Sequence, residues 1–298
     1  MLKKIVLLVI TALVLTATNA YPAAIKVLVS DNSSSTMQVI KRIEKTLGLK
    51  QPLTVGLLSQ DWQNGLAKDD LLLAIGTSAS KALIAKKLPN PQVYAFVSAA
   101  LSTPEEDRQW SAVPIEPSFS SLFSVSEKIA SLRFKKNIVI VLSDTNQRAN
   151  QQAKQQAAKH LNIQIVTVKA GEVAAKKVKR YLYEAAALIA IKDKAIWSGS
   201  SAKWLLHQTY NHRVPVIGYS KSFLKAGALV SAYSSLDAIA DQTAAVIANW
   251  RDRGEITDRG MQYAKYTVAV NPNIARALGI TRKEIKFIEG EADAPVLN

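Results

Sequence analysis

The sequence predicts an α/β protein built from two similar, doubly wound lobes. Three observations support this prediction: short apolar runs alternate with helical patterns, a polar stretch with several prolines at residues 104–121 interrupts the alternation, and the same pattern restarts after it. Buried strands at this spacing, separated by helices, are typical of parallel βαβ units.

In the first half, residues 25–29 form a β-rich run, which a series of Ser, Asp and Asn residues closes. A helix follows, because apolar residues recur three and four positions apart between residues 37 and 47, and Gly48 ends it. Further strands are expected at residues 53–58, 71–75 and 92–97, with a helix at 78–87.

Residues 104–121 are rich in proline, serine and charge, and are interpreted as a linker or crossover. After them, strands are expected at residues 138–142, 163–168, 187–191 and 214–219. Helices are expected at residues 146–161, 172–183, 200–210 and 236–250.

Residues 1–20 have the three parts of a secretory signal peptide: a cationic start, an apolar run at residues 5–17, and small residues that end at Ala20. The apolar run is too short to cross a bilayer. We expect cleavage after Ala20 and a mature protein that begins near Tyr21. No cysteine is present for a lipid anchor, so the expected location is the periplasm.

The composition argues against several kinds of function. The absence of cysteine removes disulfides, thiolate nucleophiles and cysteine-ligated metal centres. His207 and His212 are five residues apart, which does not match the spacing of a helical metal site, and His160 stands alone. The formal charge is +15, but the lysines are scattered, with little aromatic interleaving. We expect no metal, no cofactor and no nucleic-acid partner.

Polar residues follow nearly every expected strand, where ligands bind in open α/β sheets because helix N-termini and loops converge there. An N-cap or turn is the alternative role for each of them taken singly. Gly76, Thr77 and Ser78 offer the sharpest signal, because glycine allows close approach of the backbone and the next two residues add hydroxyl groups. These residues do not form the Gly-x-Ser-x-Gly motif of a hydrolase, so we do not expect an enzyme.

Three segments carry a resemblance to a known family. Residues 71–80 read LLLAIGTSAS, residues 214–220 read VPVIGYS and precede KAGAL, and residues 270–280 read VNPNIARALGI. In order and spacing they are similar to motifs of ABC-transporter substrate-binding proteins of the aromatic-amino-acid (tryptophan/tyrosine) type. The resemblance extends over roughly residues 70–280.

This resemblance implies the type I periplasmic-binding-protein fold: two Rossmann-like, doubly wound lobes joined by three crossovers, with a ligand trapped when the hinge closes. We expect the first lobe at about residues 22–115 and 228–255. The second lobe is expected at about residues 120–227 and 262–298.

The resemblance also implies where a ligand binds. One wall of the cleft is expected to carry Thr77, Ser78 and Ser98, and the other Asn146, Asp193 and Ser220, with Tyr219 as an aromatic surface. The hydroxyl groups and the amides at helix starts suit a ligand carboxylate, whereas Asp193 suits a ligand ammonium.

The function implied is that of a monomeric periplasmic binding protein, which traps a small polar ligand between its lobes and delivers it to an ABC permease of the inner membrane; an amino-acid-like molecule is one candidate for that ligand. The alternative is a degenerate binding domain that serves as sensor or adaptor for a membrane receptor or kinase. Altered cleft loops motivate that alternative: residues 98–100 replace the family's Asp-Pro, and residues 144–148 replace its Glu-x-Asn-Ser. A neighbouring permease and ATPase gene pair favours transport, and a neighbouring receptor gene favours the adaptor.

Overall fold

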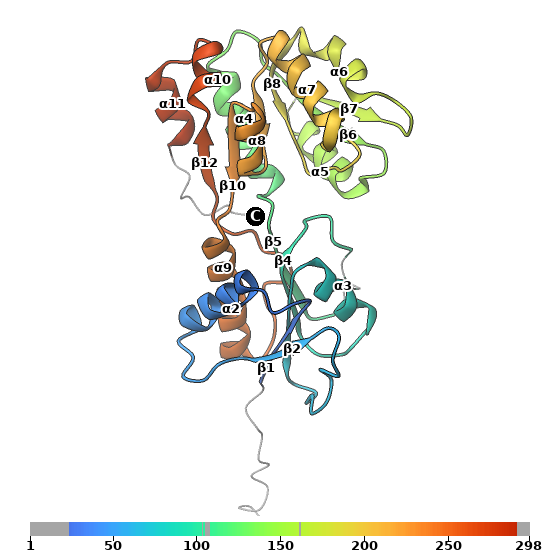
Figure 1. Cartoon of the computed structure of the whole chain (residues 1–298). Helices are drawn as coiled ribbons and strands as arrows, with labels where there is room; N and C mark the ends of the chain where they lie inside the picture. The colour runs from blue at the N-terminus through green and yellow to red at the C-terminus, as the bar shows by residue number, and fades with distance from the viewer. Residues whose placement is uncertain (1–23, 103, 105–107, 161, 291–298) are drawn as a thin grey trace, which may run out of the picture.

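The computed structural model describes residues 24–102, 104, 108–160 and 162–290, and contains two six-stranded sheets, each flanked by helices (Figure 1). The expected signal peptide lies outside the described residues. Among the helices of the described segments, none combines the length and the apolar character of a membrane span.

The first sheet is parallel throughout and has the order β11-β5-β4-β3-β1-β2. Its strands are β1 (Ile25–Val29), β2 (Thr54–Leu57), β3 (Leu71–Ile75), β4 (Gln92–Val97), β5 (Trp110–Pro114) and β11 (Gly260–Met261). All residues of β3 are buried, as expected for a strand that is covered on both faces. Leu71 and Leu73 pack against helices α2 (Ser34–Leu47) and α9 (Leu236–Arg253), and Leu72 packs on the opposite face with α3 (Thr77–Ala85).

The second sheet has the order β12-β10-β9-β8-β6-β7, and only β12 runs antiparallel to its neighbour. Its strands are β6 (Asn137–Ser143), β7 (Ile163–Val168), β8 (Ala185–Ile189), β9 (Val216–Gly218), β10 (Val230–Tyr233) and β12 (Thr267–Val270). One face carries α4 (Phe119–Ser131), α5 (Gln147–Ala157), α10 (Pro272–Ala277) and α11 (Arg282–Glu289). The other face carries α6 (Ala174–Leu182), α7 (Gly199–Asn211) and α8 (Lys221–Ala226).

The chain passes between the two lobes three times, at residues 115–118, 234–235 and 262–266. The sequence placed residues 228–255 in the first lobe, whereas β10 pairs with β9 and β12 and therefore lies in the second sheet. Residues 104–121 are also more than a linker. They contain β5, a strand with four buried residues, and the start of α4, whose N-cap Ser118 accepts a hydrogen bond from the Ser121 amide.

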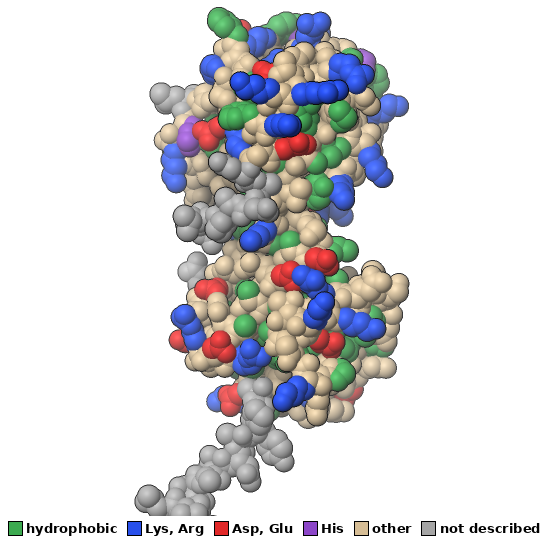
Figure 2. Space-filling view, turned by 90° about the vertical axis from the view of Figure 1, so that its left-hand side faces the viewer, with side chains coloured by type: hydrophobic (Ala, Val, Ile, Leu, Met, Phe, Trp, Pro, Cys, Tyr) green, Lys and Arg blue, Asp and Glu red, His purple; other side chains and the backbone are tan. Residues whose placement is uncertain are grey.

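A narrow waist separates the two lobes in the space-filling view (Figure 2). Lys and Arg side chains are spread over the visible face of both lobes, between residues of other types, and do not merge into one continuous patch. This distribution matches the dispersed lysines of the sequence.

Arg42 and Asp241 join α2 to α9 within the first lobe. Arg42 donates from Nε and Nη2 to the two carboxylate oxygens at 2.8 and 2.6 Å, and Thr46 donates to Oδ1 at 2.8 Å. These hydrogen bonds, that of Arg42 first, hold the pKa of Asp241 below its ordinary value of 3.8, although burial opposes them. The stability from this lowered pKa is present above 3.8 and is lost as the pH falls through the pKa of the folded state.

The Asp241→Asn variant is expected to lose about 0.5–1 kcal/mol of unfolding free energy at neutral pH, a small effect because solvent screens the pair. The difference from the unmodified protein should narrow as the pH falls below 3.8. Urea titrations over this pH range measure it. Asp252→Asn on the same helix is the control, since its side chain is 70% exposed and lies 3.7 Å from Arg251. An equal loss in both variants, or a loss that is independent of pH, contradicts the prediction.

Candidate ligand-binding cleft

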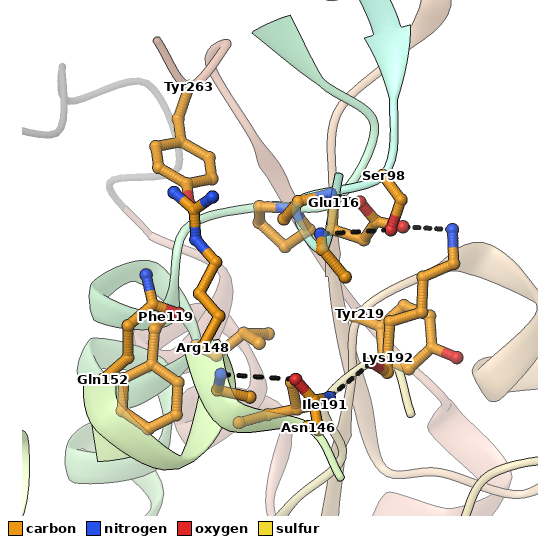
Figure 3. A pocket seen from close by; sticks show the side chains of 15 residues that line it. Ser98, Glu116, Phe119, Asn146, Arg148, Gln152, Ile191, Lys192, Tyr219 and Tyr263 are labelled. Atoms are coloured by element: carbon orange, nitrogen blue, oxygen red, sulfur yellow. Dashed lines mark hydrogen bonds and ion pairs between the residues drawn. The ribbon is translucent and has the colours of Figure 1, made fainter. Parts of the chain in front are cut away.

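Two adjoining pockets lie between the lobes, at the carboxyl ends of the strands. The inner pocket is lined by Ser98, Ala99, Ala100, Glu116, Pro117, Phe119, Leu122, Asn146, Arg148, Ala149, Gln152, Ile191, Lys192, Tyr219 and Tyr263 (Figure 3). The first lobe contributes only the loop after β4, residues 98–100, while residues 116–117 and Tyr263 come from crossovers. The remaining lining residues belong to the second lobe.

The outer pocket shares Ser98, Ala100, Asn146, Arg148 and Lys192 with the inner one and extends along the loops after β6 and β8. The outer pocket has a volume of about 750 Å³, whereas the inner one has about 50 Å³. The inner space holds only a few water molecules. A ligand larger than this therefore enters the inner pocket only if side chains or whole lobes move.

Aromatic and aliphatic side chains form the walls of the inner pocket. Phe119 stands at the start of α4, Tyr219 follows β9 and Tyr263 lies on the third crossover. Burial raises the pKa of Tyr219 to about 12, and the negative charges of Glu116 and Asp193 act in the same direction. The Tyr219 hydroxyl group is therefore protonated at neutral pH, so it can both donate and accept a hydrogen bond.

Glu116 is a buried carboxylate on the first crossover that contacts both lobes. Its Oε2 atom accepts a hydrogen bond from the Ala99 amide of the first lobe at 2.8 Å. Its Oε1 atom forms an ion pair with Lys192, which follows β8 in the second lobe. The charge of Glu116 is thus balanced within the protein, and its two contacts connect the crossover to both lobes, the hydrogen bond to the first and the ion pair to the second.

Asp193 is buried at the edge of the outer pocket, and its oxygens already have donors. Oδ2 accepts hydrogen bonds from the amide and the hydroxyl group of Ser143 at 2.8 and 2.7 Å, and Oδ1 accepts one from the Ala195 amide at 3.1 Å. Asn146 is within 3.5 Å of Oδ2. These contacts tie the loop after β6 to the loop after β8, which is an organising role for Asp193.

The N-terminal half of α5 faces the inner pocket. Asn146 caps this helix by accepting a hydrogen bond from the Ala149 amide at 3.3 Å, and donates to the Lys192 carbonyl oxygen at 3.3 Å. The half-buried Arg148 follows in the first turn, where no acidic residue is present. Among the described residues, the guanidinium group of Arg148 forms no hydrogen bond or ion pair.

The structure brings together four of the seven residues expected from the sequence. Ser98, Asn146 and Tyr219 line the inner pocket, and Asp193 lies in the outer one. The other three, Thr77, Ser78 and Ser220, line neither pocket. Thr77 and Ser78 are exposed at the start of α3, and the Ser220 hydroxyl group is 2.7 Å from that of Ser222.

Sequence reasoning missed five lining residues with clear chemical roles: Glu116, Phe119, Arg148, Lys192 and Tyr263. Arg148 and Lys192 lie within two positions of the expected Asn146 and Asp193, so the expected loops line the pockets, but these two side chains were not among the candidates. Within the described residues, no group of three or more His, Asp or Glu side chains is placed to hold a metal ion.

A protein-family model described as "ABC transporter substrate binding protein" matches residues 63–290 of the chain. A search of curated proteins found no match to this chain.

Several solved structures have a similar fold. One is the ligand-free, open structure of CD0873, a substrate binding protein with adhesive properties from Clostridium difficile. It has a TM-score of 0.62 and 15% identity, and the match covers 92% of this chain and 99% of that one. Another is an ABC domain in complex with L-Trp from Streptococcus pneumoniae, with a TM-score of 0.52, 18% identity, and coverage of 89% and 99%. A conserved domain protein from Vibrio cholerae has a TM-score of 0.53, 19% identity, and coverage of 87% and 95%.

Proposed function

Because the chain belongs to the family of ABC transporter substrate-binding proteins, we propose that its cleft binds an aromatic, amino-acid-like solute and presents it to an ABC permease of the inner membrane. The two-lobed α/β fold expected from the sequence, that of type I periplasmic binding proteins, is confirmed. Family membership supports solute binding for uptake over the alternative of a sensor or adaptor.

The observation that carries this proposal is the aromatic lining of the inner pocket. Phe119, Tyr219 and Tyr263 approach the pocket from three separate segments, and Leu122 and Ile191 add aliphatic surface. Pockets for small molecules are mostly apolar, with a few polar groups that fix the orientation of the ligand. The structurally similar protein from Streptococcus pneumoniae is described in complex with L-Trp, which supports a ligand of the same kind here.

Closure of the two lobes completes the proposed site. The first lobe presents only the loop at residues 98–100 to the pocket, and the crossovers run directly beside it. A ligand that contacts both this loop and the second lobe favours the closed arrangement, because it binds that arrangement more tightly. A permease can then distinguish the loaded protein from the empty one by the relative position of the lobes.

The proposal includes export of the chain. Cleavage after Ala20 would release a monomeric binding protein into the periplasm, on the same side of the membrane as its solute. This part rests on the signal-peptide pattern of residues 1–20 and on the extracytoplasmic location typical of the family.

A thermal-shift experiment tests the proposed ligand class. L-tryptophan, L-tyrosine and L-phenylalanine are expected to raise the melting temperature of the protein, whereas L-alanine is not. A ligand that binds only the folded state adds about 2.7 kcal/mol at one hundred times its Kd. The absence of any shift with all three aromatic amino acids contradicts the proposal.

Two tyrosine variants form a matched pair for this experiment. Tyr263→Ala removes part of the pocket wall and should weaken binding, since a buried aromatic side chain contributes apolar contact area. Tyr210→Ala removes a side chain that is 53% exposed on α7, away from the pocket, and should leave binding unchanged. Equal binding by the two variants would locate the ligand elsewhere.

A further inference from the structure

The charged groups around the inner pocket differ in whether they already have a partner. Arg148 and Lys192 are the two cations of the lining, and Glu116 is its carboxylate. Glu116 and Lys192 neutralise one another through their ion pair. Arg148 is the one charge of the described lining without an ion-pair partner in the described part of the chain.

Arg148 reaches into the pocket on the side away from that ion pair. Arg148 lines the inner pocket together with Tyr263, Phe119 and Gln152, whereas Glu116 and Lys192 meet on the other side of the view in Figure 3. The pocket therefore combines a guanidinium group with aromatic side chains. This arrangement suits a molecule that has an anionic group next to an apolar body.

The elements around Arg148 also favour an anion. The pocket faces the N-terminal half of α5, where the helix dipole is positive, and no acidic residue occupies the first turn. Guanidinium groups bind carboxylates through two parallel hydrogen bonds, and partial burial strengthens them. Lys194, exposed at the outer pocket, adds positive charge near the entrance.

An ammonium group would find no such free counterpart. The Glu116 carboxylate already bonds to Ala99 and Lys192, and the Asp193 carboxylate to Ser143 and Ala195. To bind either one, a ligand amine would have to displace a donor that the protein supplies. The electrostatics of the cleft are therefore those of an anion-binding site.

We propose that the cleft selects its ligand through a carboxylate held by Arg148, and that it does not require an amine. The ligand class is then the aromatic carboxylates, of which aromatic amino acids are only one kind. This inference rests on the proposed function, because it assigns the chemistry by which the same pocket recognises its solute. It assigns to Arg148 the carboxylate-binding role that the sequence suggested for Thr77 and Ser78, and it assigns no ligand ammonium to Asp193.

Isothermal titration with three probes that share one ring tests the proposal: 3-phenylpropionate, L-phenylalanine and 2-phenylethylamine. The first has only the carboxylate, the second has both groups and the third has only the amine. The expected result is that 3-phenylpropionate binds at least as tightly as L-phenylalanine and that 2-phenylethylamine does not bind. Preferential binding of the amine, or binding of the amino acid without the propionate, overturns the proposal.

Arg148 variants connect this selectivity to the residue. Arg148→Gln should weaken binding of 3-phenylpropionate about ten- to a hundredfold, as expected for the loss of a charge-assisted hydrogen-bonded pair. Arg148→Lys retains the charge but not the two parallel donors, so its affinity should be intermediate. Lys154→Gln, on the same helix but exposed and outside both cleft pockets, removes the same charge and should have no effect.

The outcomes separate the two proposals. If L-phenylalanine binds but Arg148→Gln and Lys154→Gln have the same affinity for 3-phenylpropionate, the proposed aromatic solute is retained and the proposed role of Arg148 is overturned. If none of the three probes binds, and the corresponding indole probes (3-indolepropionate, L-tryptophan and tryptamine) also fail, the proposed aromatic ligand is itself wrong. Melting curves of the unliganded variants should coincide, because Arg148 is only half-buried and holds no other element of the described chain in place.

Discussion

Replacing Asp193 by alanine is expected to lower the free energy of unfolding by about 3–5 kcal/mol, the largest loss expected for a single polar residue of the cleft. The substitution leaves the amide and the hydroxyl group of Ser143 and the amide of Ala195 without their shared acceptor. Because Ser143 and Asp193 are both buried, water cannot easily replace the lost carboxylate. The measurement is equilibrium unfolding in urea.

A graded series of variants distinguishes this network from a simple loss of packing. Asp193→Asn retains the shape and one acceptor oxygen, so it should lose about 1–2 kcal/mol. Ser143→Ala removes a single hydroxyl donor and should lose about 1 kcal/mol. A loss below 1 kcal/mol for Asp193→Ala would contradict the proposed organising role.

The same variants test the ligand role that the sequence suggested for Asp193. If the carboxylate bound a ligand ammonium, Asp193→Asn would lower the affinity for L-phenylalanine more than that for 3-phenylpropionate. The hydrogen bonds of Asp193 lead us to expect the same small change for both probes, together with a lower melting temperature. A selective loss of the amino acid would restore the ammonium-binding role.

The second large effect is expected for Gly218→Ala at the end of β9. A Cβ atom at this position would lie 2.3 Å from the Cβ atom of Phe223 and 2.8 Å from the Ser231 hydroxyl oxygen. The Phe223 Cβ atom moves only with the backbone of α8, so the helix or the strand must shift. We expect a loss of about 3 kcal/mol, at the upper end of the range for overpacking.

Gly48→Ala is the control for this prediction. Gly48 ends α2 with φ +64°, and a Cβ atom there would meet nothing within 4 Å. Its replacement therefore introduces only backbone strain, about 1 kcal/mol. Urea unfolding of both variants should show the larger loss at Gly218. A larger loss for Gly48→Ala than for Gly218→Ala would mean that α8 shifts at little cost to accommodate the added methyl group.

Continuous buried strands were the most predictable part of the fold. The expected ranges 71–75 and 92–97 coincide with β3 and β4, in which every residue is buried, because apolar and β-branched runs of this length have few alternatives to a covered strand. The range 163–168 coincides with β7, an edge strand of which only Val166 and Val168 are buried. β5 was not predicted, because it runs from Trp110 to Pro114 within the polar stretch at residues 104–121. β11 has two residues, and its place is decided by pairing with β5 and not by its own sequence.

The rule that ligands bind at strand ends identified loops that line the cleft, but not all of the side chains that line it. It placed Ser98 and Asn146 at the cleft, because the ends of parallel strands meet at one edge of each sheet. Glu116 and Tyr263 could not be found in this way, since they lie on crossovers whose path depends on how the lobes pack. Thr77 follows a strand end as expected, but its side chain is exposed and outside both cleft pockets.

The three passages between the lobes also determine when the chain can fold during synthesis. The first lobe needs α9 and β11, so its sheet and core remain incomplete until residue 261 has been made. The second lobe needs β12 and α11, which end at Glu289. The core between the first sheet and α2 and α9, and the core between the second sheet and α4, α10 and α11, therefore form late, and the long separation between their partner segments slows folding.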